Sequence, residues 1–263
     1  MFNTKSKKKE PVIISPSFQL PIILIFLSFM LLFFNIGSLP TIIFASFSFF
    51  LLLQSFTLRI VSRDVRSSSI KHLLRSSTES LTENSVDGIF GPLFWIFIGI
   101  IFMKLSIFLP GPLSLGFSYK AISTLDSMIG YKYDYFRYLG FFSAKIEDIF
   151  TFVPSRLVLI TLPLVSSKVY EYRLIIKKSY LDGKKYDSPN AGISEAIFAY
   201  ISGIKLGGKS KYKNEIVEKP IINETGDNCT EEKIQLICQL ILRLQFLWII
   251  IFALIFFIIS SLT

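Results

Sequence analysis

Cysteine and histidine are nearly absent from this sequence, which holds two cysteines and one histidine in 263 residues. Two cysteines, Cys229 and Cys238, cannot build a disulfide framework or a four-ligand zinc site. The single histidine, His72, excludes a histidine-rich metal centre. The patterns GxGxxG, HExxH, GxSxG and CxxC are also missing. Dinucleotide-binding, zinc-protease, serine-hydrolase and dithiol chemistry of the usual kinds therefore have no support in the sequence.

Charged residues are scarce too, at 18% of the chain, against about 25% in soluble domains. Hydrophobic residues make up 51% and are gathered into runs, which indicates a membrane protein. The net charge of +9 fits the enrichment of Lys and Arg on the cytoplasmic side of membranes. It does not favour nucleic-acid binding, because no basic patch has interleaved aromatic residues. We expect an all-α, multi-pass helical membrane protein with re-entrant or interfacial helices and one polar cytoplasmic face.

Three regions follow from the hydrophobic runs. Residues 1–58 hold a basic tail and two predicted membrane spans, at 18–34 and 41–58. Residues 59–239 form a mixed central region, and residues 240–263 a C-terminal span of Ile, Leu and Phe. Basic residues on both outer sides of the first two spans place these ends in the cytoplasm.

The central region predicts a membrane hairpin. An apolar segment at 90–108 is followed by the break LPGPLSLG and a second helical segment at 112–128. A re-entrant hairpin would keep the polar stretches 62–88, 120–150 and 168–235 together on the cytoplasmic face. Such a hairpin has to pack inside protein, since lipid cannot satisfy irregular backbone.

Three carboxylates, those of Glu79, Glu83 and Asp87, recur every four residues. On a helix this spacing places them on one stripe, where like charges repel. Two interpretations remain open. The stripe is either a solvated acidic face or a site for a metal ion or another cation.

The stretch DSPNAGISEA, residues 187–196, is polar and opens into a helical pattern. Ser188 or Asn190 is expected to cap a helix starting near residue 191, and Gly192 to leave room for a close contact. The free N–H groups of such a helix start can bind an anion. An ordinary helix cap is the alternative. Residues 206–210, LGGKS, hint weakly at a phosphate-binding loop in which Gly207 and Gly208 form a second nest.

Taken in order, the polar stretches resemble the CobD/CbiB proteins of cobalamin biosynthesis, the adenosylcobinamide-phosphate synthases. The matching stretches, between residues 59 and 219, are SRD (62–64), TESLTENSVDGIFGPLFW (78–95), STLDSMIGYKYDYFRYLGFFSAKIEDI (123–149), VPSRL (153–157) and DSPNAGISEAIFAYISGIKLGG (187–208). Each motif is weak alone, but the combination is highly specific.

The resemblance implies a cell-membrane enzyme that joins cobyric acid, through a corrin propionate, to aminopropanol or its phosphate. It implies ATP and Mg²⁺ as cofactors, contact with membrane lipid, no nucleic acid, functional loops in the cytoplasm, and association with other late enzymes of the vitamin B12 pathway. The catalytic candidates are Glu79, Glu83, Asp87, Asp126 and Asp148, with Glu83 and Asp87 as magnesium ligands. The candidates for binding substrate or ATP are Arg63, Asn84, Tyr131, Arg156, Ser188, Asn190, Gly192, Gly207 and Gly208.

The sequence departs from the family pattern in its N-terminal part. Residues 1–58 lack the usual D-x-x-x-G-D-P motif and the His-Pro that follows it. Two other interpretations therefore stay open. One is a non-catalytic relative that binds corrinoid or scaffolds B12 enzymes, and the other a small membrane transporter.

Overall fold

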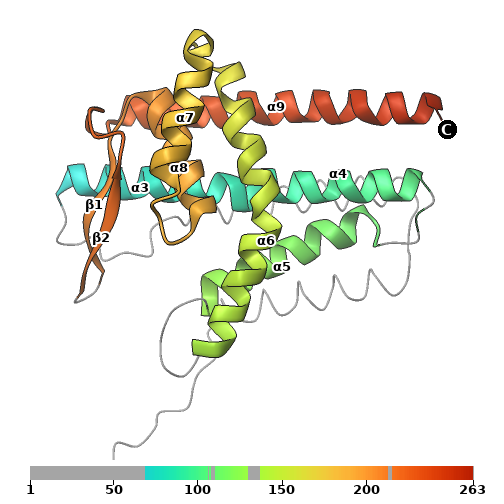
Figure 1. Ribbon diagram of the computed structural model, residues 1–263, viewed down its shortest axis with the longest axis horizontal. Coiled ribbons are helices and arrows are strands. Elements are labelled where there is room, and N and C mark those ends of the chain that lie inside the picture. Colours follow the sequence, from blue (N-terminus) through green and yellow to red (C-terminus); the bar gives the residue numbers. More distant parts are fainter. Residues whose placement is uncertain (1–68, 106, 108–109, 130–136, 213–214, 263) are drawn as a thin grey trace, which may run out of the picture.

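The computed structural model describes residues 69–105, 107, 110–129, 137–212 and 215–262. Within these ranges the chain is mostly helical (Figure 1). The longer helices are α3 (Ile70–Ser85), α4 (Gly91–Lys104), α5 (Pro112–Ile129), α6 (Arg137–Thr161), α7 (Tyr172–Gly183), α8 (Pro189–Ser202) and α9 (Glu231–Leu262). The shorter ones are the π-helix η1 (Val86–Phe90) and the 3₁₀ turns η2 (Leu162–Val165) and η3 (Val169–Glu171). The predicted spans at 18–34 and 41–58 lie outside the described residues.

Helices α3, η1 and α4 form one uninterrupted helix, and α9 runs beside it in the same direction (Figure 1). Aromatic side chains join the two. The rings of Phe97 and Phe252 stack with centroids 4.1 Å apart, and Phe90 meets Trp248 edge-on at 5.1 Å. Both helices begin at the end of the molecule that carries the strands and α8, and both run away from it.

The hairpin expected at 90–108 and 112–128 is present as α4 and α5, which pack closely against each other. Gly99 permits this approach, because a Cβ there would lie 2.5 Å from the Cα of Pro112. Helix α6 crosses the α3–α4 helix (Figure 1), and the Trp95 indole donates to the carbonyl of Phe150 at 3.1 Å.

Among the described residues, three helices are long and apolar enough to cross a membrane, at Ile70–Lys104, Gly140–Val165 and Glu231–Leu262. These helices indicate a membrane-associated protein. The C-terminal helix is longer than the predicted span, since it begins at Glu231 rather than at 240. Helix α6 likewise begins well before the apolar run FVPSRLVLITLPLVS at residues 152–166.

A β-hairpin corrects the expectation of an all-α fold. Strands β1 (Leu206–Tyr212) and β2 (Glu215–Ile222) pair antiparallel, with a register irregularity between Leu206 and Gly208. The sequence did not predict this hairpin, because β1 is rich in Gly and Lys, which have low strand propensity. A two-stranded hairpin is marginal alone, and this one packs against α3, α7 and α8.

The hydrophobic core lies where α8 meets α6, α9 and the hairpin. Helix α8 is buried along almost its whole length, so it has no solvent-exposed face. Its fully buried apolar side chains are Ile193, Ala196, Ile197, Phe198 and Ala199. The polar groups that this helix carries are consequently buried as well, and they need partners inside the protein.

Candidate functional site

The turn before α8 is bound to α6 by side-chain hydrogen bonds. Asn190 donates from Nδ2 to the carbonyl of Asp148 at 2.8 Å, while its Oδ1 accepts from the guanidinium of Arg156. Arg156 also donates to the Ser155 hydroxyl at 2.9 Å, and its guanidinium lies 4.0 Å from the ring centroid of Phe152. Three separate sequence motifs, KIED, VPSRL and SPNAG, therefore meet at one buried point.

Side-chain capping by Ser188 or Asn190 was predicted here, and the structure corrects it. The helix begins at Pro189 with Ser188 as its N-cap residue, but no side-chain capping hydrogen bond forms. The Ser188 hydroxyl instead donates to Oδ1 of Asp148 at 3.3 Å. The reason is tertiary: both side chains form hydrogen bonds with Asp148 of α6 instead of with their own helix.

Gly192 has a packing role that the sequence did not reveal. A Cβ at this position would lie 2.2 Å from the Gly183 carbonyl and 2.7 Å from the Tyr186 Cβ. The space beside Gly192 is thus filled by the end of α7, and the room predicted for a ligand is taken by the protein itself. The assignment of Gly192 to ligand binding has no support from this geometry.

A buried ionic network joins α3, α8 and the hairpin. Glu79 and Glu195 are 1% and 0% exposed, and the ammonium of Lys219 lies 3.7 Å from one carboxylate and 3.1 Å from the other. The Gly207 N–H donates to Oε1 of Glu79 at 3.0 Å, and Arg75 adds an ion pair at 3.8 Å. The Gly207 N–H therefore binds an internal carboxylate here, whereas the sequence predicted that it forms part of a phosphate-binding nest.

This network has an unusual charge balance. Burial raises the pKa of Glu195 to about 8, Lys219 opposes this shift, and the nearby Glu83 and Glu79 add to it. Although burial alone would lower it, the pKa of Lys219 is raised by Glu195 and the other carboxylates. The Tyr186 hydroxyl lies beside Glu195, and burial together with this carboxylate raises the pKa of Tyr186.

A second acidic group surrounds Asp87, which lies in the π-helix η1. The carboxylates of Glu147 and Glu83 interact with Asp87 electrostatically, and Lys120 is its cationic neighbour. Glu147 accepts a hydrogen bond from Thr151, whose hydroxyl is 2.9 Å from that of the fully buried Tyr119. Short π segments inside α-helices often mark functional sites.

The predicted stripe is helical, but its three carboxylates do not share one site. A step of four residues turns a helix by roughly 40° beyond one full turn, so the stripe drifts around the axis. Glu79 consequently faces the hairpin, Asp87 faces α5 and α6, and Glu83 interacts with members of both groups. Asp126 belongs to the second group, since it interacts electrostatically with the carboxylates of Asp148 and Glu83.

The donors around Asp87 suit a magnesium ion chemically, because Mg²⁺ prefers carboxylate oxygens. Within the described ranges, however, no three His, Cys, Asp or Glu side chains converge as ligands. A magnesium ion held by Glu83 and Asp87 would therefore need other oxygens, which a bound phosphate could supply.

The remaining site residues predicted from the sequence lie in different parts of the chain. Arg63 and Tyr131 lie outside the described residues, and Asn84 lies one residue beyond Glu83 on α3. Gly208 has a positive φ of 81° and lines a cavity at the start of α3. No sequence motif pointed to four further charged residues of the two groups, Glu195, Lys219, Glu147 and Lys120. Glu195 could have been found as the single carboxylate in an otherwise apolar helix, whereas nothing local marks Lys219.

Comparison with known proteins gives one consistent result. Residues 54–241 match the family described as CobD/Cbib protein. Curated relatives named "Cobalamin biosynthesis protein CobD" include those of Synechocystis sp., 41% identical over 72% of this chain and 52% of the relative, and of Clostridium acetobutylicum, 37% identical over 74% and 59%. The Listeria monocytogenes protein is 36% identical over 74% and 58%. The chain thus spans a little over half the length of these relatives. No solved structure matches it.

Proposed function

Because this chain belongs to the CobD/Cbib protein family, we propose that it acts in cobalamin biosynthesis as an ATP-dependent amide-forming ligase. In this proposal a propionate of cobyric acid is joined to the amine of aminopropanol or aminopropanol phosphate, and the product is cobinamide or its phosphate. The relatives' names state only the pathway, and the ligation is our proposal for the site.

One observation supports a catalytic role most strongly. The motifs TESLTENSVDG, KIED, VPSRL and SPNAG are up to about a hundred residues apart in the chain, yet their polar side chains meet between α3, α6 and α8. Asn190 touches Asp148 and Arg156 directly, and Asp148 in turn interacts with Asp126. A structural core would use apolar residues here, since burying polar groups costs free energy even when they are paired.

Ligation requires activation of the carboxylate, because a carboxylate does not react with an amine at neutral pH. One oxygen of the propionate attacks a phosphorus of ATP, which gives an acyl phosphate and ADP or an acyl adenylate and pyrophosphate. The amine then attacks the acyl carbon, the phosphate or AMP leaves, and the amine's proton passes to a base. Magnesium, when bound, would neutralise the phosphate charge.

The residues of this chain divide these tasks in our proposal. Glu83 and Asp87 would hold a magnesium ion together with phosphate oxygens, and Asn84 would orient a phosphate or amide. Asp126 or Asp148 takes the proton as a general base. Arg156 positions Asn190 and provides positive charge beside Asp148.

The proposal is tested with purified protein, cobyric acid, aminopropanol phosphate and ATP, with product followed by mass spectrometry. Glu83→Gln and Asp87→Asn should each lower the rate at least about tenfold, the scale on which loss of a metal-binding interaction acts. Glu232→Gln, an exposed carboxylate at the start of α9, is the matched control and should retain the wild-type rate. Wild-type rates in both acidic-site variants would overturn the proposal, as would a folded wild-type protein that forms no product.

A further inference from the structure

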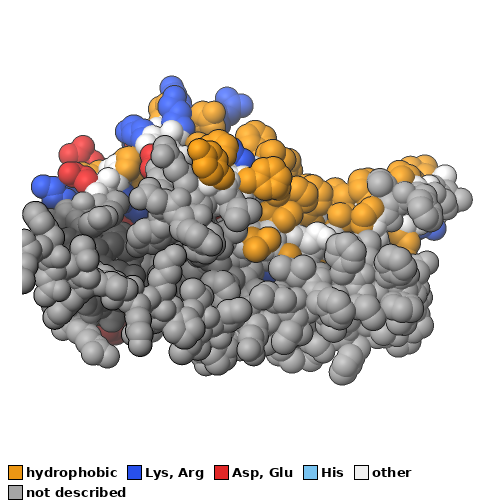
Figure 2. All heavy atoms as spheres, turned by 90° about the horizontal axis from the view of Figure 1, so that it is seen from below, with side chains coloured by type: hydrophobic (Ala, Val, Ile, Leu, Met, Phe, Trp, Pro, Cys, Tyr) orange, Lys and Arg blue, Asp and Glu red, His pale blue; other side chains and the backbone are white. Residues whose placement is uncertain are grey.

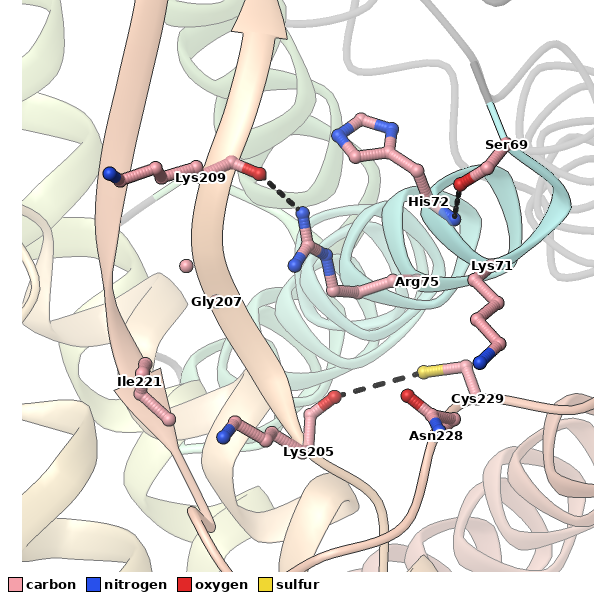
Figure 3. Close-up of a pocket in the computed structure, with 11 residues that line it drawn as sticks. Ser69, Lys71, His72, Arg75, Lys205, Gly207, Lys209, Ile221, Asn228 and Cys229 are labelled. Carbon is pink, nitrogen blue, oxygen red and sulfur yellow. Dashed lines mark hydrogen bonds between the residues drawn. The ribbon is translucent and has the colours of Figure 1, made fainter.

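A cavity of about 500 Å³ lies where the start of α3 meets β1 and the segment before α9 (Figure 3). Its lining comes from the start of α3 and from residues 205–229, which are distant from α3 in sequence. The lining residues are Ser69, Lys71, His72, Arg75, Lys205, Gly207, Gly208, Lys209, Ile221, Asn228 and Cys229.

The charge of this cavity is one-sided. Four cationic side chains, Lys71, Arg75, Lys205 and Lys209, contribute to the lining, and no carboxylate does among the residues described there. Figure 3 shows Arg75 projecting from α3 toward β1, where its guanidinium donates to the Lys209 carbonyl at 2.6 Å. Gathering like charges around one space is unfavourable unless an anion offsets it.

We propose that this cavity binds the phosphoryl group of a phosphate ester or polyphosphate. Its volume exceeds what one phosphate needs, so the rest of the ligand has room beside the phosphoryl group. Lysine ammonium groups and an arginine are the side chains that bind phosphate in proteins. The inference does not depend on the ligation proposed above, because it concerns binding only.

The sequence around the cavity also has the letters of a P-loop, GIKLGGKS at residues 203–210. The structural context differs from that motif, which follows a strand and opens a helix. Here Gly203 ends helix α8 in the left-handed region with φ of 72°, and the remaining residues enter strand β1. The Gly207 N–H is already bound to Glu79. The proposal therefore relies on the cationic side chains and the cavity, not on a phosphate-binding backbone loop.

The cavity adjoins the buried ionic network. Arg75 lines the cavity and pairs with Glu79, and Gly207 lines it while donating to the same carboxylate. An anion in the cavity would attract Arg75 and thereby act on the environment of Glu79. Phosphoryl binding in the cavity would in this way change the electrostatic environment of Glu195 and Lys219 inside the protein.

The test is equilibrium binding of pyrophosphate to the full chain in a neutral detergent. Lys71→Gln combined with Lys205→Gln removes two cations of the cavity. The Kd should rise roughly tenfold or more, since hydrogen bonds to charged groups contribute on this scale. Lys177→Gln combined with Lys178→Gln removes the same charge from an exposed part of α7 and should leave the Kd unchanged.

A second set of variants keeps the test decisive if the double variant does not fold. Lys209→Gln alone, at an exposed position, should weaken binding, and Lys205→Arg, which keeps the charge, should preserve it. Absence of pyrophosphate binding to the wild type at millimolar concentration would overturn the proposal. Equal affinities of the wild type and the cavity variants would do so too.

The same measurement in lipid nanodiscs distinguishes the sources of the phosphoryl group. If pyrophosphate binds equally in phosphatidylcholine and in phosphatidylglycerol discs, the natural ligand is a soluble phosphate compound. If phosphatidylglycerol displaces pyrophosphate from the wild type, the ligand is an anionic lipid headgroup. Because each of these is a binding result, loss of ligation activity would not be mistaken for either.

Discussion

At several positions that the sequence leaves ambiguous, the contacts of single atoms reveal the role of the residue, and Gly192 is the clearest example. Its conversion to Ala would normally favour a helix, because Ala has the higher helix propensity. Here the added Cβ would lie 2.2 Å from the backbone oxygen of Gly183, which has no freedom to rotate away. We expect Gly192→Ala to lower the free energy of unfolding by about 1–3 kcal/mol, as overpacking does.

Gly111→Ala is the matched control for this prediction, because a Cβ at Gly111 would meet no atom within 4 Å. Its effect should stay within about 0.5 kcal/mol. Thermal and denaturant unfolding of both variants in detergent measures the difference. A Gly192→Ala protein as stable as the control would show that α7 and α8 do not approach each other this closely.

The second residue-scale prediction concerns Glu195, whose raised pKa of about 8 lies above that of an exposed carboxyl. Between these two pKa values the folded protein binds more protons than the unfolded chain, so stability falls as pH rises. The contribution is complete below the unfolded value and is lost as pH passes about 8. The slope for one group is at most about 1.4 kcal/mol per pH unit.

We expect the melting temperature to fall between pH 6 and pH 8 in the wild type, and this slope to become smaller in Glu195→Gln. Asp182→Asn provides a control of opposite sign. Although burial would raise it, hydrogen bonds from Lys185, Tyr200 and Asn223 lower the pKa of Asp182, so its contribution is lost only in acid. The Asp182 variant should keep the wild-type slope. An unchanged slope in Glu195→Gln would mean that this carboxyl does not titrate in the window.

At the scale of elements, Asn190 joins α8 to α6. Its amide donates to Asp148 and accepts from Arg156, so it needs both ends of the amide group. As a helix cap, Asn would be replaceable by Ser at little cost. As a bridge it is not, because a hydroxyl cannot reach both partners. We expect Asn190→Ser and Asn190→Ala to destabilise the protein alike, by about 1–3 kcal/mol for the buried groups left unpaired.

Ser188→Ala is the comparison, since it removes one hydrogen bond of 3.3 Å and should cost less. Unfolding measurements on the three variants rank them. Wild-type stability of the Asn190→Ser protein would mean that Asn190 is an ordinary helix cap and not a bridge between α8 and α6. The Asn190 variants should also lower activity if the α6–α8 junction positions Asp148.

At the scale of the whole molecule, the polar and apolar parts separate along its length. Figure 2 shows hydrophobic side chains gathered toward the end at which α9 stops, and charged side chains toward the other end. Large apolar side chains on the last turns of α9 are exposed, among them Leu254, Phe257, Ile258 and Leu262. Such a surface is stable in lipid but not in water.

The arrangement constrains how the helices sit in a bilayer. Helix α6 crosses the α3–α4 helix (Figure 1), so the three candidate spans cannot all lie along the membrane normal. Helix α6 carries Lys145, Asp148 and Arg156 along its length, which favours the membrane surface for it. We therefore expect α4, α5 and the end of α9 to be inserted, and α6 to lie at the cytoplasmic interface.

Cysteine labelling tests this orientation in a background with Cys229 and Cys238 replaced by Ser. Cysteines at Lys145 and Lys209 should both react with a membrane-impermeant reagent from the cytoplasmic side. A cysteine at Phe257 should react from neither side, because hydrocarbon covers it. Labelling of positions 145 and 209 from opposite sides would contradict a single polar face and would make α6 a true membrane span.

The sequence by itself determined the membrane character, the helical hairpin at α4 and α5, the C-terminal apolar helix and the family. These depend on hydrophobic runs, breaks and ordered motifs, which are local properties of the chain. The tertiary structure decided the rest. It placed Lys219 between two buried glutamates, turned the caps of SPNAG into a bridge to α6, and filled the space beside Gly192 with α7. Such pairings join residues that are distant in sequence, and no local pattern records which distant surface will cover a given side chain.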